Sequence, residues 1–339
     1  MTSSPVSVNS AGLPPVVFVV SSPLQLFNAI EARDRFHSGQ PSHLLIIWKK
    51  IIDNEQMQAL LDDGWASCRW LRHGGWARAW YAQLLAPWLA AMAGAEVLYL
   101  GYPLNVRAHV ANVLSPPRIV LLDDGHATLH LMQLLDDPAY RAIRAPGVVD
   151  RLLGRRVGLD YTDRAELFTV YRPDGWPVER MIHNDFRAFR AKAARLPHTG
   201  RLLFIGSDLA GNIIPDSATE ERLFAAMSAY YAGREVVYSA HRYENVESMR
   251  ASPALAGIKV IRYPTLLEYA LYQEGALPAG ISTFCSSAID TLTDIYGLPA
   301  EVLMIPEALL KPEKVEVMRS LYVNYRERGI PVIPLHVPD

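Results

Sequence analysis

The chain has 339 residues, half of them hydrophobic and a fifth charged, which is the profile of a globular protein long enough for two domains. The formal net charge of −2 provides no global attraction to nucleic acid, so we expect no nucleic-acid partner. The two cysteines, Cys68 and Cys285, exclude a disulfide framework and indicate a reducing, cytoplasmic compartment.

The first half of the chain alternates short β-branched runs with helical patterns. Residues 1–15 are polar and lack the basic and apolar regions of a signal peptide, so they predict a disordered tail. Residues 76–100 are strongly hydrophobic, but charged residues and Pro87 interrupt them, which favours a buried helix and strand over a membrane span. Ser22 and Pro23 supply an N-cap and a first-turn proline for the first helix. We expect strands at 16–21, 43–48, 96–100 and 118–122, and helices at 22–32, 76–93 and 105–113.

The second half repeats this alternation after a less regular middle. "LFTVYRPDGWP" predicts a strand and a turn, residues 184–195 a basic helix, and we place the domain boundary between 195 and 196. Two capping-box patterns, Ser217–Glu220 and Thr265–Glu268, are predicted to open helices, and residues 312–328 form the last helix. The expected strands are "RLLFIGS", "EVVYSAH", "IKVIRYP", "AGISTF" and "AEVLMIP".

Two blocks of strand–helix alternation predict an α/β fold with two doubly wound Rossmann-type domains, 16–195 and 196–339. In such sheets ligands bind outside the carboxyl ends of the strands. Polar clusters follow five of the apolar runs. If the two domains open toward one cleft, all five clusters would line that cleft, as in a GT-B glycosyltransferase. The clusters are Ser21-Ser22, Asp123-Asp124, Gly206-Ser207-Asp208, His241-Arg242 and Ser286-Ser287.

The acidic pair in "RIVLLDDGHATL" is the most unusual of these clusters. A partly desolvated carboxylate beside a second one has a raised pKa, which makes it a better proton acceptor near neutral pH. Gly125 permits a tight turn and the close approach of a ligand. The alternative is that Asp124 only caps a helix beginning near His126. Because the acids are adjacent rather than spaced as D-x-D, we expect no metal.

The other clusters suit anion binding, although each also has a plain structural interpretation. His241 can donate a proton to a leaving phosphate with Arg242 adding charge, or it can simply start a helix. Ser286 and Ser287 stand at a strand-to-helix junction, where free N–H groups attract anions, or one of them serves only as an N-cap. "FIGSDLAGN" matches neither G-x-G-x-x-G nor the P-loop pattern, which argues against a dehydrogenase or a kinase.

The order of the motifs resembles the bacterial sialyltransferases related to α-2,8-polysialyltransferases and lipooligosaccharide sialyltransferases. "SSPLQLFNAIEA", "LLDDG", H-R-x-E and "SSA" occur in that order between Val16 and Pro306. The resemblance implies a metal-independent, inverting GT-B enzyme that transfers sialic acid, a related nonulosonic acid or Kdo from a CMP-activated donor. The acceptor would be a saccharide hydroxyl of lipooligosaccharide or capsule.

The resemblance also implies roles for individual residues. Asp124 matches the general base, with Asp123 as second choice or support. His241 matches a histidine that contacts the CMP phosphate, although Arg242 stands where the family has proline. The N-terminal domain is then the acceptor side, with Ser22, Gln25 and Asn28 as contacts, and the C-terminal domain holds the donor. Its donor-binding residues are Gly206, Ser207, Asp208, His241, Arg242, Ser286 and Ser287.

Two basic stretches fit an anionic glycan or an anionic inner leaflet, which predicts a cytoplasmic protein in peripheral contact with the inner membrane, unless these residues are solvated helix faces. They hold Arg141, Arg144, Arg151, Arg155 and Arg156, and Arg187, Arg190, Lys192 and Arg195. Two other functions are compatible with the scaffold. An epimerase acting on nucleotide sugars would need no sugar acceptor, and an anionic-glycan-binding protein would have no catalytic groups.

Overall fold

The computed structural model describes residues 13–172 and 176–338. Most of the predicted tail, 1–12, and part of the predicted turn, 173–175, lie outside the described residues. The chain divides into two compact units, Met1–Ala188 and Phe189–Asp339. The acceptor-side and donor-binding roles of the two domains stay predictions.

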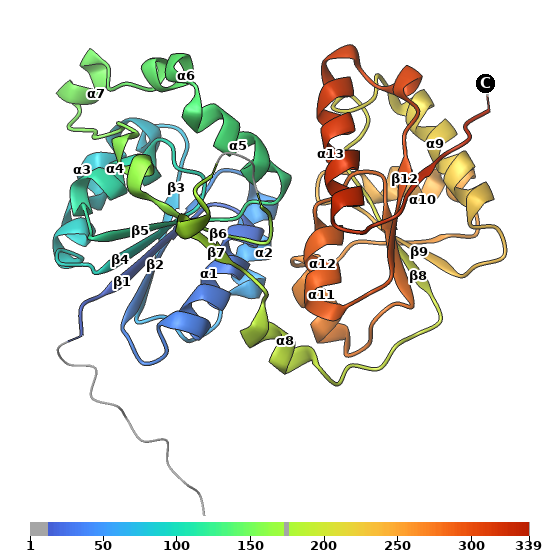
Figure 1. The fold of residues 1–339 in the computed structure, drawn as a ribbon, viewed down its shortest axis with the longest axis horizontal. Helices are drawn as coiled ribbons and strands as arrows, with labels where there is room; N and C mark the ends of the chain where they lie inside the picture. The colour runs from blue at the N-terminus through green and yellow to red at the C-terminus, as the bar shows by residue number, and fades with distance from the viewer. Residues whose placement is uncertain (1–12, 173–175, 339) are drawn as a thin grey trace, which may run out of the picture. The chain divides into compact units, whose positions relative to one another are not determined.

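The first unit is built on a seven-stranded parallel sheet with the order β3-β2-β1-β4-β5-β6-β7 (Figure 1). All residues of β1 and β4 are buried, as expected for parallel strands covered on both faces. The strand order reverses between β1 and β4, which is where doubly wound sheets bind ligands. The strands are β1 (Val16–Val20), β2 (Ser42–Trp48), β3 (Ser67–Arg72), β4 (Val97–Leu100), β5 (Arg118–Leu122), β6 (Glu166–Thr169) and β7 (Met181–His183).

Helices connect these strands and cover the sheet, so the apolar core lies between the sheet and the helices. The first helix begins as predicted, with the Ser22 hydroxyl accepting from the Gln25 N–H and Pro23 at the first position. The helices of the first unit are α1 (Pro23–Phe36), α2 (Ile51–Leu60), α3 (Ala77–Ala91), α4 (Val106–Leu114), α5 (His126–Asp136), α6 (Pro138–Ile143), α7 (Val148–Leu152) and α8 (Arg187–Ala193, which continues into the second unit).

The second unit has a six-stranded parallel sheet with the order β10-β9-β8-β11-β12-β13, so its strand order reverses between β8 and β11. The strands are β8 (Leu202–Ile205), β9 (Val236–Ser239), β10 (Lys259–Ile261), β11 (Gly280–Thr283), β12 (Ala300–Met304) and β13 (Val332–Pro334). The helices are α9 (Ser217–Tyr230), α10 (Val246–Ala251), α11 (Leu267–Glu274), α12 (Ala288–Tyr296) and α13 (Val315–Glu327). The structure thus confirms the predicted α/β class with two doubly wound sheets.

Both capping-box predictions are wrong in their residues. Helix α9 is capped by Asp216, whose carboxylate accepts from the Thr219 N–H at 2.9 Å, so the N-cap lies one residue before the predicted cap and Ser217 is the first residue of the helix. Helix α11 begins after Leu266 with no side-chain cap. Glu268 is instead buried and accepts a hydrogen bond from the Thr291 hydroxyl of α12.

Burial raises the pKa of Glu268 to about 7. A folded-state pKa above the unfolded value of about 4.5 stabilises the fold fully below pH 4.5, and this contribution is lost as the pH rises through 7. Glutamine cannot ionise, so Glu268→Gln should not lose this stability as the pH rises. The free energy of unfolding of the variant relative to that of the wild type should therefore increase by up to about 3 kcal/mol between pH 5 and pH 8. Denaturant unfolding at several pH values measures it.

The matched control is Glu235→Gln, because Glu235 is exposed at the start of β9 and its substitution should leave the pH dependence unchanged. If the stabilities of Glu268→Gln and the wild type change in parallel between pH 5 and pH 8, the raised pKa of Glu268 is contradicted.

Candidate functional site

The polar clusters predicted from the sequence lie at the carboxyl ends of the two sheets, on either side of each point where the strand order reverses. In the first unit, Ser21 and Ser22 follow β1, Gly101 follows β4, and Asp123 and Asp124 follow β5. Hydrogen bonds link the ends of β1 and β5, so these residues form one connected group.

Asp123 is a structural acid that holds the turn after β5. It is 2% exposed, and both of its carboxylate oxygens are used. Oδ1 accepts from the Gly125 N–H at 2.7 Å and the Thr128 hydroxyl at 2.9 Å, while Oδ2 accepts from the Thr169 hydroxyl at 2.6 Å and the Val170 N–H at 3.1 Å. Burial raises the pKa of Asp123 to about 6, although these hydrogen bonds oppose the rise. With its lone pairs directed at the protein, Asp123 is poorly placed to take a proton from a substrate.

Asp124 is the more exposed carboxylate of this turn. It is partly exposed, and its Oδ1 accepts from the Ser22 hydroxyl at 2.6 Å, across from the end of β1. The N-cap of α5 is Gly125, at φ 68°, and it has no side-chain cap, so Asp124 does not have the capping role considered as the alternative. The positive φ explains the glycine, because other residues rarely adopt it.

Gln25 and Asn28 of α1 are buried rather than solvent-facing. Gln25 Oε1 accepts from the Ser21 N–H at 2.8 Å, and a Cβ added at Gly101 would lie 1.9 Å from that oxygen, so a larger residue after β4 would displace the buried Gln25 side chain. Asn28 donates to the Asp123 carbonyl at 3.0 Å and accepts from Asn184 at 2.9 Å. Asn28 therefore supports the acidic turn from beneath, whereas Ser22 contacts Asp124 directly.

The sequence analysis missed Arg107, which follows the N-terminus of α4. Its guanidinium donates to the Tyr102 carbonyl and attracts Asp124, and burial lowers the pKa of Arg107. The partly buried Arg107 therefore places a positive charge near the Asp124 carboxylate. Arg107 is the second residue of α4, and no sequence pattern distinguishes an arginine there from a surface residue.

In the second unit, Thr283 at the end of β11 organises the loop that carries the paired serines. Its hydroxyl donates to the Ile205 carbonyl of β8 at 2.8 Å and accepts from the Ser286 N–H at 3.0 Å. The Ser286 hydroxyl accepts from the Ala288 N–H at 3.4 Å. Ser287 is the N-cap residue of α12 by position, yet its side chain makes no cap hydrogen bond. Its hydroxyl and the first turn of α12 thus remain suited to an anion.

His241 follows β9 and is positioned by a buried acid. The Tyr243 N–H donates to His241 Nδ1 at 3.4 Å, which places the proton of a neutral ring on Nε2, where it can be donated. The His241 N–H donates to Glu244, which also accepts from the Tyr238 hydroxyl at 2.6 Å. Burial, together with negative Glu220 and Asp208, raises the pKa of Glu244 to about 7.

Gly206 and Glu244 are packed against each other. A Cβ added at Gly206 would lie 2.4 Å from Glu244 Oε2, so only glycine fits at the end of β8 above this acid. Ser207 is buried beside Cys285, whose pKa burial raises to about 11, so the thiol is not a nucleophile at neutral pH. Asp208 is partly exposed, and the Arg242 guanidinium stacks on the Tyr243 ring at 5.1 Å. Glu244 was visible in H-R-x-E, but nothing in the sequence indicated its burial.

The described residues contain no group of three or more histidine, cysteine, aspartate or glutamate side chains arranged to hold a metal ion. Within the same residues, no helix combines the length and hydropathy needed to cross a membrane.

Comparisons with known proteins bear on the fold. No protein-family model matches the chain, and no curated protein matches its sequence. Among solved structures, the chain is similar to UGT2 from Phytolacca americana in complex with UDP-2-fluoro-glucose and pterostilbene, at 13% identity and a TM-score of 0.50 over 96% of this chain and 86% of that one. A UDP-glucosyltransferase from Polygonum tinctorium matches at 13% identity and a TM-score of 0.50 over 97% and 87%.

A protein from Listeria monocytogenes assigned as a UDP-N-acetylglucosamine 2-epimerase matches at 11% identity and a TM-score of 0.51 over 89% of this chain and 81% of that one. At such identities the likeness shows the fold alone. The fold is GT-B-like, with two parallel α/β units.

Asp123→Asn tests the structural role of the buried acid. An amide nitrogen in place of one oxygen faces two N–H or O–H donors, so we expect the first unit to lose about 2–4 kcal/mol of stability in denaturant unfolding. The matched control is Asp124→Asn, which keeps an oxygen for the Ser22 hydroxyl and should lose less than about 1 kcal/mol. Equal losses in the two variants would contradict this division of roles.

Proposed function

We propose that the chain is an inverting, metal-independent glycosyltransferase that moves sialic acid, or a related nonulosonic acid or Kdo, from a CMP-activated donor to a hydroxyl of a bacterial surface glycan. The observation that carries the proposal is the contrast between the two adjacent acids. Asp123 is buried with four donors on its carboxylate, while Asp124 is partly exposed and held by Ser22 and the positive Arg107. Only one of the pair is in a position to meet a substrate hydroxyl.

The reaction requires one proton acceptor and one group that stabilises a departing phosphate. The acceptor hydroxyl oxygen forms a bond to the anomeric carbon, the bond from that carbon to the phosphate oxygen breaks, and CMP leaves with the electron pair. The hydroxyl proton passes to Asp124, a step that typically contributes about 10²–10⁴-fold in rate. Attack from the side opposite to the phosphate inverts the anomeric configuration.

The second unit supplies groups suited to the donor. The hydroxyls of Ser286 and Ser287, with the N-terminus of α12, are preorganised dipoles for the phosphate as its charge develops. His241, with its proton on Nε2, donates to the same phosphate, and Arg242 adds positive charge. Gly206 and Ser207 form the turn after β8, and their small size leaves room for the donor. Asp208 repels phosphate, so we assign it to a hydroxyl or amino group of the nucleoside.

An epimerase acting on nucleotide sugars is the second candidate, and the specific observation in its favour is the fold similarity to the Listeria protein. The two functions differ in their need for an acceptor. Release of CMP from CMP-sialic acid that depends on an added saccharide acceptor supports the transferase. Conversion of the donor sugar without an acceptor supports the epimerase.

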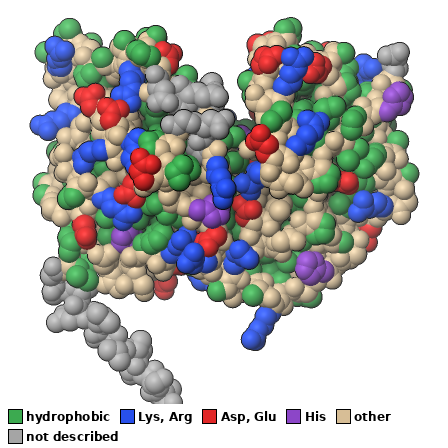
Figure 2. Space-filling model, in the orientation of Figure 1, with side chains coloured by type: hydrophobic (Ala, Val, Ile, Leu, Met, Phe, Trp, Pro, Cys, Tyr) green, Lys and Arg blue, Asp and Glu red, His purple; other side chains and the backbone are tan. Residues whose placement is uncertain are grey.

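Peripheral contact with a membrane is the second part of the proposal. Helices α6 and α7 and the loop between them expose four apolar side chains, Ile143 at 80%, Val148 at 71%, Val149 at 61% and Leu152 at 80%, among the arginines of the first basic stretch. Exposed apolar residues beside basic ones suit an anionic lipid surface. Elsewhere on the face of the first unit shown in Figure 2, basic and acidic side chains are interspersed.

Exchanging Asp124 should separate catalysis from donor binding. Asp124→Asn should lower the rate of acceptor-dependent CMP release at least about 100-fold while calorimetry shows unchanged CMP binding, because the base is removed but the phosphate contacts are kept. His241→Ala should instead weaken CMP binding and slow CMP release, because it removes a proton donor to the leaving phosphate. Loss of CMP binding in Asp124→Asn would defeat the assignment of the general base.

Membrane contact can be tested by co-sedimentation with vesicles of phosphatidylglycerol and phosphatidylcholine. We expect the protein to bind these vesicles and the double variant Ile143→Glu, Leu152→Glu to lose most of that binding, because it exchanges apolar contacts for repulsion. Val178→Glu is the control, since Val178 is 75% exposed in the same unit outside these helices. Equal binding by the double variant and the control would refute the surface.

A further inference from the structure

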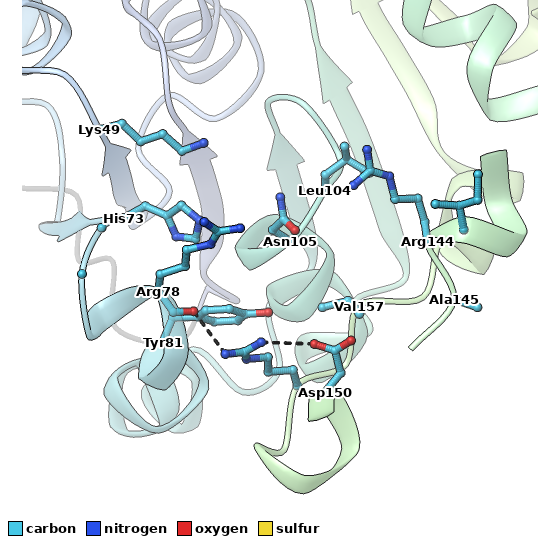
Figure 3. Close-up of a pocket in the computed structure, with 14 residues that line it drawn as sticks. Lys49, His73, Arg78, Tyr81, Leu104, Asn105, Arg144, Ala145, Asp150 and Val157 are labelled. Carbon is cyan, nitrogen blue, oxygen red and sulfur yellow. Dashed lines mark hydrogen bonds and ion pairs between the residues drawn. The ribbon is translucent and has the colours of Figure 1, made fainter. Parts of the chain in front are cut away.

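A recess lined by none of the proposed catalytic or donor-binding residues lies at the carboxyl end of the first sheet. Its volume is about 490 Å³, within the range of small-ligand sites, and it opens beside Lys49 after β2, His73 after β3 and Asn105 before α4 (Figure 3). A smaller recess of about 140 Å³ shares Lys49, His73 and Asn105 with it and extends to Ser21 and Arg107.

The recess is strongly basic. Four cationic side chains line it, Lys49, Arg78, Arg144 and Arg155, against one carboxylate, Asp150. Arg155 is committed to the structure, because it pairs with Asp150 at 3.3 Å and binds backbone carbonyls of α3. Lys49 and Arg78 form no salt bridge within the described part of the chain, and Figure 3 shows both reaching toward the space around Asn105. The positive charge is therefore available to a ligand.

His73 lies among the same positive charges. Its pKa is lowered to about 4, first by burial and then by Lys49, Arg107, Arg78 and Arg155. The ring is thus neutral at physiological pH. Its Nδ1 is buried and has no hydrogen-bond partner among the described residues. A buried ring nitrogen without a partner is costly unless a ligand or water pairs with it, and His73 lines both recesses.

Asn105 adds a strained backbone at the centre of the recess. It has φ 55° and ψ −114°, a conformation that suits glycine, and although it is the N-cap residue of α4 its side chain makes no cap hydrogen bond. Strain of this kind costs about 1–3 kcal/mol and is concentrated at ligand sites. The Asn105 side chain is exposed and lines both recesses.

The smaller recess extends from the basic recess to Ser21 and Arg107, which lie near the proposed base. Ser21, at its edge, adjoins Ser22, which donates to Asp124, and Arg107 on its wall attracts Asp124. A saccharide with its reacting hydroxyl at Asp124 would extend along this path, so that a neighbouring sugar unit reaches Lys49 and Arg78.

We propose that this recess binds an anionic substituent, a carboxylate or a phosphate, on the acceptor saccharide, with Lys49, Arg78 and Arg144 as its charge partners and Asn105 and His73 as hydrogen-bond partners. The inference rests on the proposed function, because it identifies the acceptor as an acidic glycan. Arginine and lysine bind both anions, arginine in a bidentate manner.

The test is calorimetric binding of three saccharides to the full chain in the absence of donor. Sialyllactose carries a carboxylate, lactose 6-phosphate a phosphate, and lactose neither. We expect at least one anionic sugar to bind about tenfold or more tightly than lactose, and Lys49→Ala and Arg78→Ala each to remove most of that difference. The preferred sugar distinguishes carboxylate from phosphate. Arg78→Lys, which keeps the charge, should retain part of the affinity. It replaces Arg78→Ala in the test if the alanine variant does not fold.

Lys259→Ala, at an exposed lysine of β10, is the control and should bind like the wild type. Equal affinities for the three sugars, or retention of the preference in both alanine variants, would overturn the proposal. Loss of CMP binding in the alanine variants would assign the recess to the nucleotide and overturn it as well. Anion-dependent binding without any glycosyl transfer would instead defeat the proposed function and leave the subsite standing.

Discussion

The carboxylate of Asp123 is the interaction on which the candidate site of the first unit depends. Four donors from three segments of chain converge on it, from the turn itself, from α5 and from the end of β6. A buried acid that is fully hydrogen-bonded fixes its backbone firmly, so the next residue can point out of the sheet toward Ser22. The two adjacent acids therefore differ in role: Asp123 builds the turn, and Asp124 stays partly exposed beside Ser22, as the proposed general base requires.

The same arrangement recurs in the second unit with other residues. Glu244 is buried beneath the end of β8, accepts from Tyr238 and from the His241 N–H, and so positions the histidine. In both units a glycine at a central strand end packs against a buried polar side chain, Gly101 against Gln25 and Gly206 against Glu244. Each sheet thus carries its strand-end groups on a buried polar support, which is what a preorganised site requires.

The sequence predicts the central strands well because they are apolar on both faces, and the polar residues after them mark their carboxyl ends. It predicts the edges poorly. Strand β3 was missed, since four of its six residues are exposed or charged and its pattern has no clear period. Burial was the main difficulty at the site. The burial of Gln25, Asn28 and Glu244 has no local signature in the sequence. Asn28 pairs with residues far along the chain, Asp123 and Asn184. Gln25 and Glu244 make hydrogen bonds to near neighbours, but they lie beneath strand ends that only the tertiary fold covers. For the same reason the basic recess around Lys49, His73 and Arg78, from three different strand ends and loops, was not predicted.

The central claim is that the chain uses a CMP-activated sugar, although the similar folds include enzymes that use UDP-sugars. The most direct measurement is calorimetric titration of the full chain with CMP, UDP and GDP, repeated with Ser287→Ala. The account predicts that CMP binds at least about tenfold more tightly than the other two and that the serine variant weakens it. Tighter binding of UDP, or CMP binding that is unaffected by the loss of the Ser287 hydroxyl, would contradict it.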